Sequence, residues 1–262
     1  MFDINTELNK IKNELLNGIL DPFYDNSLTS FILGKSKMIR SRVAIYYLKM
    51  QEKDITTDIT KILATGEIIH NASLLHDDVI DNAKFRRNES TISNKYNDKL
   101  SILSGDYLTS YAIEKLLNLS KIDILCLFKT CVQEMSLAEI EQYFLRGKVP
   151  DINKYIEICS KKTGKLFSTI LESCAILTDT DCNIARNFGN SFGIYFQMLN
   201  DLQKDSAEND KLNKQYTIKD ILGIEKTNYL LDDYREEIYN FLNEFPNNTF
   251  KKELKELVRT LK

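Results

Sequence analysis

Two aspartates, Asp77 and Asp81, follow an apolar stretch and stand four positions apart. On a helix this spacing places both carboxylates on one face, one turn apart. Two carboxylates on one face repel each other unless a cation lies between them. Mg²⁺ suits such a pair, because it takes one or two carboxylates and completes its shell with water and phosphate oxygens. The alternative interpretation is a solvated acidic helix end.

Two arginines, Arg86 and Arg87, come directly after this acidic cluster. A guanidinium binds phosphate oxygens through two parallel hydrogen bonds. Paired carboxylates followed by paired arginines therefore indicate a site for a metal-bound diphosphate. A surface cluster of ion pairs, which contributes little energy, is the alternative.

The stretch HDDVIDNAKFRRNEST, which begins at His76, resembles the first aspartate-rich motif of trans-isoprenyl (polyprenyl) diphosphate synthases. That motif is a DDxxD followed by two arginines and a threonine. The later segment LSILSGDYLTSYA resembles the Gly-Asp segment of the same family. Further matches follow in order over about residues 30–205, and they favour medium- and long-chain members such as octaprenyl diphosphate synthases. The resemblance implies Mg²⁺ as cofactor, bound by Asp77, Asp78 and Asp81.

The segment GKSKMIR resembles the GGKRxRP element that binds the diphosphate of isopentenyl diphosphate in this family. The resemblance assigns Lys37 and Arg40 to that substrate, together with His70 and Arg87. A histidine inside an apolar helix is more often a satisfied core residue. His70 nevertheless lies seven positions before Asp77, about two turns, so both share a face. Three positions of the element depart from the family pattern: Ser36, Met38 and Ser41.

The segment KTGKLF resembles the KTxxLF helix that binds the allylic diphosphate. By resemblance, Lys162 and Thr163 join Arg86 around this second substrate. For the neighbouring Lys161 and Lys165, a pair of solvated lysines is the alternative interpretation. Earlier in the chain, EIEQ stands where the family has a Gly-Glu/Gln element, but an alanine replaces the glycine, so a role there is weakly supported.

The segment FQMLNDLQKD resembles the second aspartate-rich motif, FQxxDDxxD, with changes. Asn200 replaces the first aspartate and Lys204 the last, while Asp201 is retained and Gln197 matches the glutamine. In the family the first position binds a third Mg²⁺, and a neutral amide oxygen is a poorer ligand for a hard cation. Asn200 and Asp201 remain the expected metal ligands here.

Two further positions are assigned by pattern. Lys214 corresponds to the late Gly-Lys-x-Thr lysine of the family, with an asparagine in place of the glycine, and is expected to bind substrate. Asn200 and Glu208 also have the spacing of the Asn/Ser/Glu metal motif of terpene cyclases, although Lys204 stands where its serine would be.

Product length is expected to depend on the helix before the first motif. Ala72 and Ser73, about one turn before Asp77, occupy positions where short-chain family members carry a large aromatic residue. Small side chains there leave a channel open, so the resemblance implies a product longer than C20. Three large residues are candidates for a deeper floor of that channel: Tyr111, Met135 and Phe144.

The function implied is condensation of isopentenyl diphosphate with an allylic diphosphate. The main catalytic residues implied are Asp77, Asp81, Arg86 and Lys162. A non-catalytic or partner-dependent subunit of a heteromeric synthase would explain the altered second motif, but the intact first motif opposes it. A terpene-cyclase-like enzyme would not need the isopentenyl diphosphate residues. A helical scaffold protein with acidic patches would bind no diphosphate.

These side chains require helices to position them. Gly (9) and Pro (3) are scarce in the 262 residues, and apolar residues recur at helical spacing through most of the chain. We therefore expect an all-α, single-domain helical bundle, residues 1–262, around a central cavity. The expected helices cover these ranges: 8–19, 28–50, 57–81, 99–118, 122–146, 152–177, 181–204, 225–243 and 248–261, with a loop at 205–215.

Charge and composition restrict the partners. The net charge of −3 gives no reason to expect nucleic acid. The five cysteines form no Cys-x-x-Cys pair, which favours reduced core residues. No signal segment and no apolar run long enough to span a bilayer is seen, so a soluble, cytoplasmic protein is expected. The resemblance also implies a homodimer.

Overall fold

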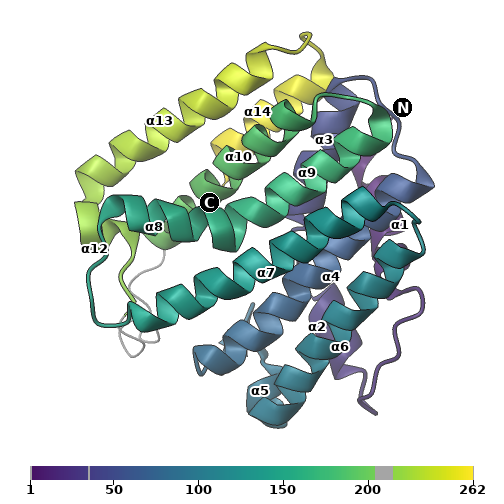
Figure 1. The fold of residues 1–262 in the computed structure, drawn as a ribbon, viewed down its shortest axis with the longest axis vertical. Helices are drawn as coiled ribbons and strands as arrows, with labels where there is room; N and C mark the ends of the chain where they lie inside the picture. The colour runs from purple at the N-terminus through teal and green to yellow at the C-terminus, as the bar shows by residue number, and fades with distance from the viewer. Residues whose placement is uncertain (1, 35, 204–214, 262) are drawn as a thin grey trace. The chain divides into compact units, whose positions relative to one another are not determined.

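The computed structural model describes residues 2–34, 36–203 and 215–261. Over these residues the chain is almost entirely helical, with one two-stranded sheet, and the expected all-α class is confirmed (Figure 1). The chain separates into two compact units. The first comprises Met1–Ile45 and Ile55–Leu125, and the second comprises Tyr46–Asp54 and Cys126–Lys262. The single domain around a central cavity stays a prediction.

The first unit is built around α4, a long apolar helix that packs against α1, α5 and α6. The side chain of Thr56 caps α4 by accepting a hydrogen bond from the backbone of Ile59, and most residues from there to Leu75 are buried. Its elements, with the beginning of α3, are α1 (Ile4–Leu16), α2 (Ser27–Leu33), α3 (Ile39–Met50), α4 (Thr57–Ile80), β1 (Phe85–Arg86), β2 (Glu89–Ser90), α5 (Ile92–Lys95) and α6 (Asp98–Leu117).

The second unit is built around α10, which packs along α9 and α13 and also contacts η1, α8 and α12 (Figure 1). Aromatic rings pack in its core: the ring centroids of Phe167 and Phe192 lie 5.1 Å apart in a tilted pair, and those of Tyr47 and Phe188 lie 5.2 Å apart in a stacked pair. Its elements are α7 (Ile122–Phe144), α8 (Ile152–Cys159), the π-helix η1 (Ser160–Gly164), α9 (Lys165–Thr178), α10 (Cys182–Gln203), α12 (Ile218–Leu222), α13 (Ile224–Asn243) and α14 (Thr249–Thr260).

Most helical ranges agree with the prediction, but two of the predicted long helices are wrong, because each is interrupted in the structure. The range 28–50 contains α2 and α3, because Gly34 leaves the helical conformation and Met38 has a positive φ of 46°. The range 152–177 is interrupted by η1. The short elements β1, β2, α5 and α12 were not predicted, and most of the expected loop at 205–215 lies outside the described residues.

The cysteines are free thiols, and three of them (Cys131, Cys159 and Cys174) are buried, as expected for core residues. Burial raises the pKa of the Cys174 thiol to about 12, so this thiol is unreactive at neutral pH. Within the described ranges, no helix combines the length and apolar character needed to cross a membrane.

Candidate active site

The paired carboxylates lie at the C-terminal end of α4. Asp81 is the C-cap residue of α4, and its backbone N–H donates to the carbonyl oxygen of Asp77 over 2.8 Å. Both side chains are partly exposed. Asp77 and Asp81 are therefore one turn apart, as the spacing predicted.

These two carboxylates fit a magnesium ion of the substrate-bridging kind. In the described part of the chain, no three His, Cys, Asp or Glu side chains converge as a ready cage. Mg²⁺ does not need such a cage, since it keeps several waters and is bound by one or two carboxylates together with substrate phosphate. Asp77 and Asp81 supply that number of carboxylates, and their role as ligands stays a prediction.

Asp78, the residue between them in sequence, has a different environment. Its side chain is fully buried, and Oδ1 accepts a 2.7 Å hydrogen bond from Nε of Arg86. Burial raises the pKa of the Asp78 carboxyl to about 6, against the lowering effect of Arg86. Its other oxygen, Oδ2, is buried without a hydrogen bond. Asp78 therefore holds Arg86 in place, and its predicted contact with metal is untested.

The two arginines lie on a hairpin. β1 and β2 pair Arg86 with Glu89, and the turn between them is Arg87-Asn88. Both turn residues have positive φ, 54° and 68°, which is the conformation of a two-residue hairpin turn that matches strand twist. Asn tolerates this region better than most side chains. The hairpin therefore places Arg86 and Arg87 in a fixed geometry close to the end of α4.

Two of the basic residues assigned to isopentenyl diphosphate, Arg40 and Arg87, lie close enough to His70 within the first unit for their charges to act on it. Burial, followed by the charges of Arg40, Arg87 and Arg86, lowers the pKa of His70 well below its ordinary value. His70 is therefore neutral at pH 7 and can donate one N–H to a phosphate oxygen. Lys37 is exposed.

Buried Glu67 anchors the beginning of α3. Its Oε1 accepts hydrogen bonds from the backbone N–H of Ser41, over 3.3 Å, and from its hydroxyl, over 2.8 Å. Ser41 is one of the departures from the family element, and Glu67 was not singled out from the sequence. The pair fixes the backbone next to Arg40.

The residues expected to set product length lie on buried and half-buried faces of α4. Ala72 is 2% exposed, and Ser73, which is partly exposed, donates its hydroxyl to the carbonyl of His70. Of the three deeper candidates, Tyr111 is buried and its hydroxyl donates to the backbone of Asn17, while Phe144 is 72% exposed. The assignment to a product channel stays a prediction.

In the second unit, Lys162 lies on η1 and faces α7. Its ammonium pairs with the carboxylate of Glu139 and donates to Oε1 of Gln142 over 3.0 Å. Glu139 and Gln142 are the first and last residues of the EIEQ element, whose role was only weakly supported by the resemblance. A π-helical turn bulges the backbone, and such turns are frequent at functional sites.

Next to Lys162, three predicted residues form a line of hydrogen bonds. The hydroxyl of Thr163 donates to Oε1 of Gln197 over 2.9 Å, and Nε2 of Gln197 donates to Oδ1 of Asp201, also over 2.9 Å. The phenol of Tyr155 donates to Oδ2 of Asp201 over 2.6 Å. Sequence reasoning missed Tyr155, because its pairing with Asp201 joins residues 46 positions apart.

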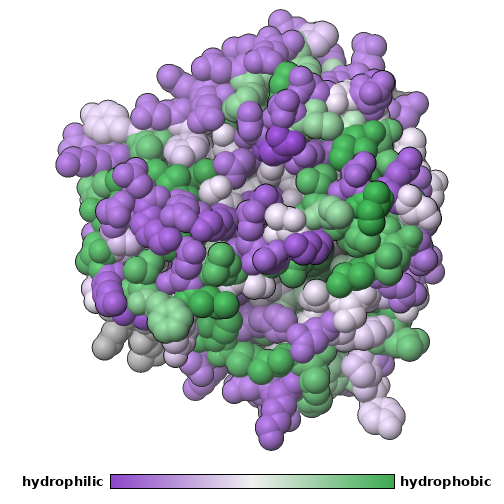
Figure 2. All heavy atoms as spheres, viewed as in Figure 1, coloured by the Kyte–Doolittle hydropathy of each residue, from purple (hydrophilic) through white to green (hydrophobic). Residues whose placement is uncertain are grey.

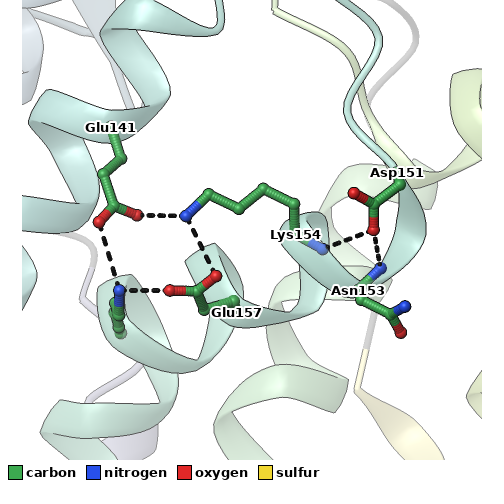
Figure 3. Close-up of polar contacts among 6 residues, drawn as sticks. Glu141, Asp151, Asn153, Lys154 and Glu157 are labelled. Carbon is green, nitrogen blue, oxygen red and sulfur yellow. Dashed lines mark hydrogen bonds and ion pairs between the residues drawn. The ribbon is translucent and has the colours of Figure 1, made fainter.

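A network of alternating charges ties α8 and η1 to α7 (Figure 3). Lys154 bridges Glu141, over 2.8 Å, and Glu157, over 3.0 Å, and Lys161 pairs with the same two carboxylates. The helix that carries Lys154 begins at Asp151, whose carboxylate accepts from two backbone N–H groups. Lys161, with 24% of its side chain exposed, is therefore paired with two carboxylates, which disfavours the alternative of a solvated lysine.

The second aspartate-rich motif is described only in part. Asn200 is partly exposed, and Asp201 is 8% exposed. The remaining positions discussed above lie outside the described residues: Lys204, Glu208 and Lys214.

Comparison with known proteins gives consistent matches. The profile of the polyprenyl synthetase family matches residues 21–261. A decaprenyl-diphosphate synthase from Dictyostelium discoideum is 30% identical over 241 residues, which are 84% of this chain and 53% of that protein. This chain thus spans little more than half the length of that relative.

Solved structures share the fold. A heptaprenyl diphosphate synthase from Staphylococcus aureus superposes with a TM-score of 0.88 at 21% identity, covering 99% of this chain and 98% of that one. A geranyltransferase from Helicobacter pylori, crystallised with magnesium and isoprenyl diphosphate, superposes with a TM-score of 0.81 at 23% identity, covering 97% and 94%.

Proposed function

The chain belongs to the polyprenyl synthetase family, and we propose that it condenses isopentenyl diphosphate with an allylic diphosphate to give an all-trans polyprenyl diphosphate. The observation that carries this proposal is the end of α4, where Asp77 and Asp81 lie one turn apart and the hairpin of Arg86 and Arg87 follows. Carboxylates for a cation and guanidinium groups for phosphate are the two needs of a diphosphate-transferring site.

The residues divide between two diphosphates. Lys37, Arg40, Arg87 and neutral His70 bind isopentenyl diphosphate. A guanidinium carries five N–H donors, and Asp78 accepts from the one at Nε of Arg86. The N–H groups on the two terminal nitrogens of Arg86 therefore remain to donate to the allylic diphosphate. In the second unit, Lys162, Thr163 and Gln197 serve the same substrate, with Lys214 as the predicted late lysine.

Asp77 and Asp81 would bind Mg²⁺, with Asn200 and Asp201 of the second motif as further ligands. When bound, the cation neutralises the charge that grows on the leaving diphosphate. The allylic C1–O bond breaks, and the double bond of isopentenyl diphosphate attacks C1, which leaves a tertiary cation on the isopentenyl unit. Loss of a proton from its C2 to diphosphate then forms the new double bond. The arginine and lysine side chains stabilise the leaving group electrostatically, and the reaction needs no protein nucleophile.

We extend the proposal to product length, assembly and location. The named relative makes a decaprenyl diphosphate, and small Ala72 and Ser73 support a product longer than C20.

Exposed apolar side chains on α6, including Leu103 and Leu117, support a homodimer, because exposed apolar surface marks association sites. On the face drawn in Figure 2, hydrophobic side chains (green) emerge among hydrophilic ones (purple). The cytoplasm is the proposed location.

The test is an elongation assay. Purified protein is incubated with Mg²⁺, labelled isopentenyl diphosphate and farnesyl diphosphate, and the dephosphorylated products are sized. A ladder that ends at a defined length, and that disappears in Asp77→Ala, is expected. No incorporation by the wild type would contradict the proposal. It would favour the partner-dependent subunit, for which Asn200 in place of a carboxylate is the specific observation.

A further inference from the structure

Asp201 is held from two sides by donors of different elements. Tyr155 of α8 donates to Oδ2 over 2.6 Å, and Gln197 of α10 donates to Oδ1 over 2.9 Å. Both Tyr155 and Asp201 are buried, with 6% and 8% of their surfaces exposed. The carboxylate therefore has one orientation, because rotation about its bond to the chain would break both hydrogen bonds.

The direction of each hydrogen bond in this line is fixed by chemistry. An ionised carboxylate only accepts hydrogen bonds, so the phenol of Tyr155 donates its O–H to Asp201. Gln197 must turn its amide nitrogen toward Asp201, because its oxygen accepts from Thr163.

We infer that Tyr155 is a positioning residue that orients the Asp201 carboxylate for Mg²⁺ and the allylic diphosphate. The inference rests on the proposed function. Asn200 contributes only a neutral oxygen to the motif, so the orientation of the charged Asp201 carries more of the interaction with the cation. Hydrogen-bond partners of a ligating carboxylate typically alter affinity or activity by about 10- to 100-fold when they are removed.

The first experiment measures binding and turnover of Tyr155→Phe. The matched control is Tyr195→Phe on α10, which removes another buried phenol oxygen, one that bonds the backbone carbonyl of Val258 over 3.4 Å. Calorimetry with farnesyl thiodiphosphate and Mg²⁺ is expected to give about 10- to 100-fold weaker binding for Tyr155→Phe and wild-type binding for the control. The KM for isopentenyl diphosphate should be unchanged in both variants.

A double-mutant cycle separates positioning from packing. If Tyr155 acts through Asp201, the effect of Tyr155→Phe on thiodiphosphate binding disappears in the Asp201→Asn background, where the carboxylate is absent. A purely structural role for Tyr155 would leave the same loss in both backgrounds. Tyr155→Met, which also removes the phenol but places a flexible apolar side chain in the same position, serves in place of Tyr155→Phe if that variant does not fold, and the same loss of binding is expected.

The outcomes distinguish this inference from the function beneath it. A wild type that elongates, together with a Tyr155→Phe variant that matches Tyr195→Phe in binding, overturns the positioning role alone. A wild type that neither elongates nor binds farnesyl thiodiphosphate overturns the proposed function and the inference together. The positioning role is established if Tyr155→Phe weakens thiodiphosphate binding when Asp201 is present and has no effect in the Asp201→Asn background.

Discussion

At the residue scale, Asp77 and Asp78 are neighbours in sequence with different surroundings. Successive helical residues point about 100° apart, so Asp77 is partly exposed while Asp78 is buried against Arg86. One carboxylate is thus available at the surface of α4, and the other fixes a guanidinium. A single acidic motif supplies both a predicted cation ligand and the support for a predicted phosphate ligand.

Removing the charge of Asp77 or Asp81 tests the predicted metal pair. Asp77→Asn and Asp81→Asn should each lower kcat/KM by about 100-fold or more, because a charged group aimed at the developing transition state is lost. Steady-state kinetics at saturating Mg²⁺ measures the effect. Asp58→Asn is the control, since Asp58 lies at the other end of α4 and pairs only with Lys61 among the contacts seen. Equal kinetics for all three variants would contradict the assignment.

Restoring a charge at position 200 should strengthen the second motif. Asn200→Asp replaces a neutral amide oxygen with a carboxylate, so the apparent affinity for Mg²⁺ should rise on the order of tenfold. A titration of elongation rate against Mg²⁺ measures the shift. Superimposable titration curves for wild type and variant would refute a ligand role for this position.

His70 should make the folded state sensitive to acid. Its pKa is lowered in the folded protein, so below about pH 6.5 the unfolded chain binds a proton that the folded chain does not. The free energy of unfolding should therefore fall with decreasing pH, by up to about 1.4 kcal/mol per pH unit. Asp78, with a raised pKa of about 6, acts with the opposite sign: its contribution is lost as pH rises.

The His70→Gln variant isolates the histidine from this opposing contribution. Asp78 is present in both proteins and cancels in their difference, while the histidine contribution is absent from the variant. Denaturant unfolding of both proteins between pH 7 and pH 5 should show a shallower pH dependence for His70→Gln. Parallel pH profiles would show that His70 is not buried neutral.

At the element scale, close packing of two helices positions the line from Thr163 to Asp201. A Cβ at Gly193 of α10 would lie 2.5 Å from the Cα of Gly164, so no larger residue fits between these backbones. The adjacent π-turn η1 carries Lys162 and Thr163 toward α7 and α10. Backbone proximity therefore allows the short side chain of Thr163 to reach Gln197.

Gly193→Ala tests that contact. Helix propensity alone would favour alanine by about 1 kcal/mol, but overpacking against Gly164 costs roughly 1–3 kcal/mol. We expect net destabilisation, measured by chemical denaturation, together with weaker allylic-diphosphate binding. Asn187→Ala, on the exposed face of α10, is the control and should change stability by no more than about 0.5 kcal/mol. A stabilised Gly193→Ala protein would contradict the close approach.

At the scale of the whole molecule, product length is the property that the chain as a whole must set. Ala72→Phe places an aromatic ring in α4 before the first motif and should shorten the product ladder, as measured by chromatography of dephosphorylated products. Because Ala72 is 2% exposed, the larger ring is expected to cost stability, so partly exposed Ser73→Phe is a parallel variant. An unchanged ladder in both variants would show that neither residue faces the growing chain.

The all-α class, most helix bounds and the identity of the first motif were determined by the sequence itself. Apolar periodicity and caps such as Thr56 and Asp151 act over a few neighbouring residues, so they can be identified from the sequence without knowledge of the tertiary structure. The spacing of Asp77 and Asp81 on one helix belongs to the same class of local information. Family resemblance then supplied roles that periodicity alone does not contain.

Only the tertiary structure decided which partners these residues have. Tyr155 meets Asp201 across 46 positions, and Lys162 meets Gln142 across 20, and no local pattern encodes such pairings. The π-turn of η1 and the Arg87-Asn88 hairpin depend on packing that overrides intrinsic preference. Burial of Asp78 likewise follows from packing of the first unit, because the environment of a side chain depends on distant segments brought together by folding.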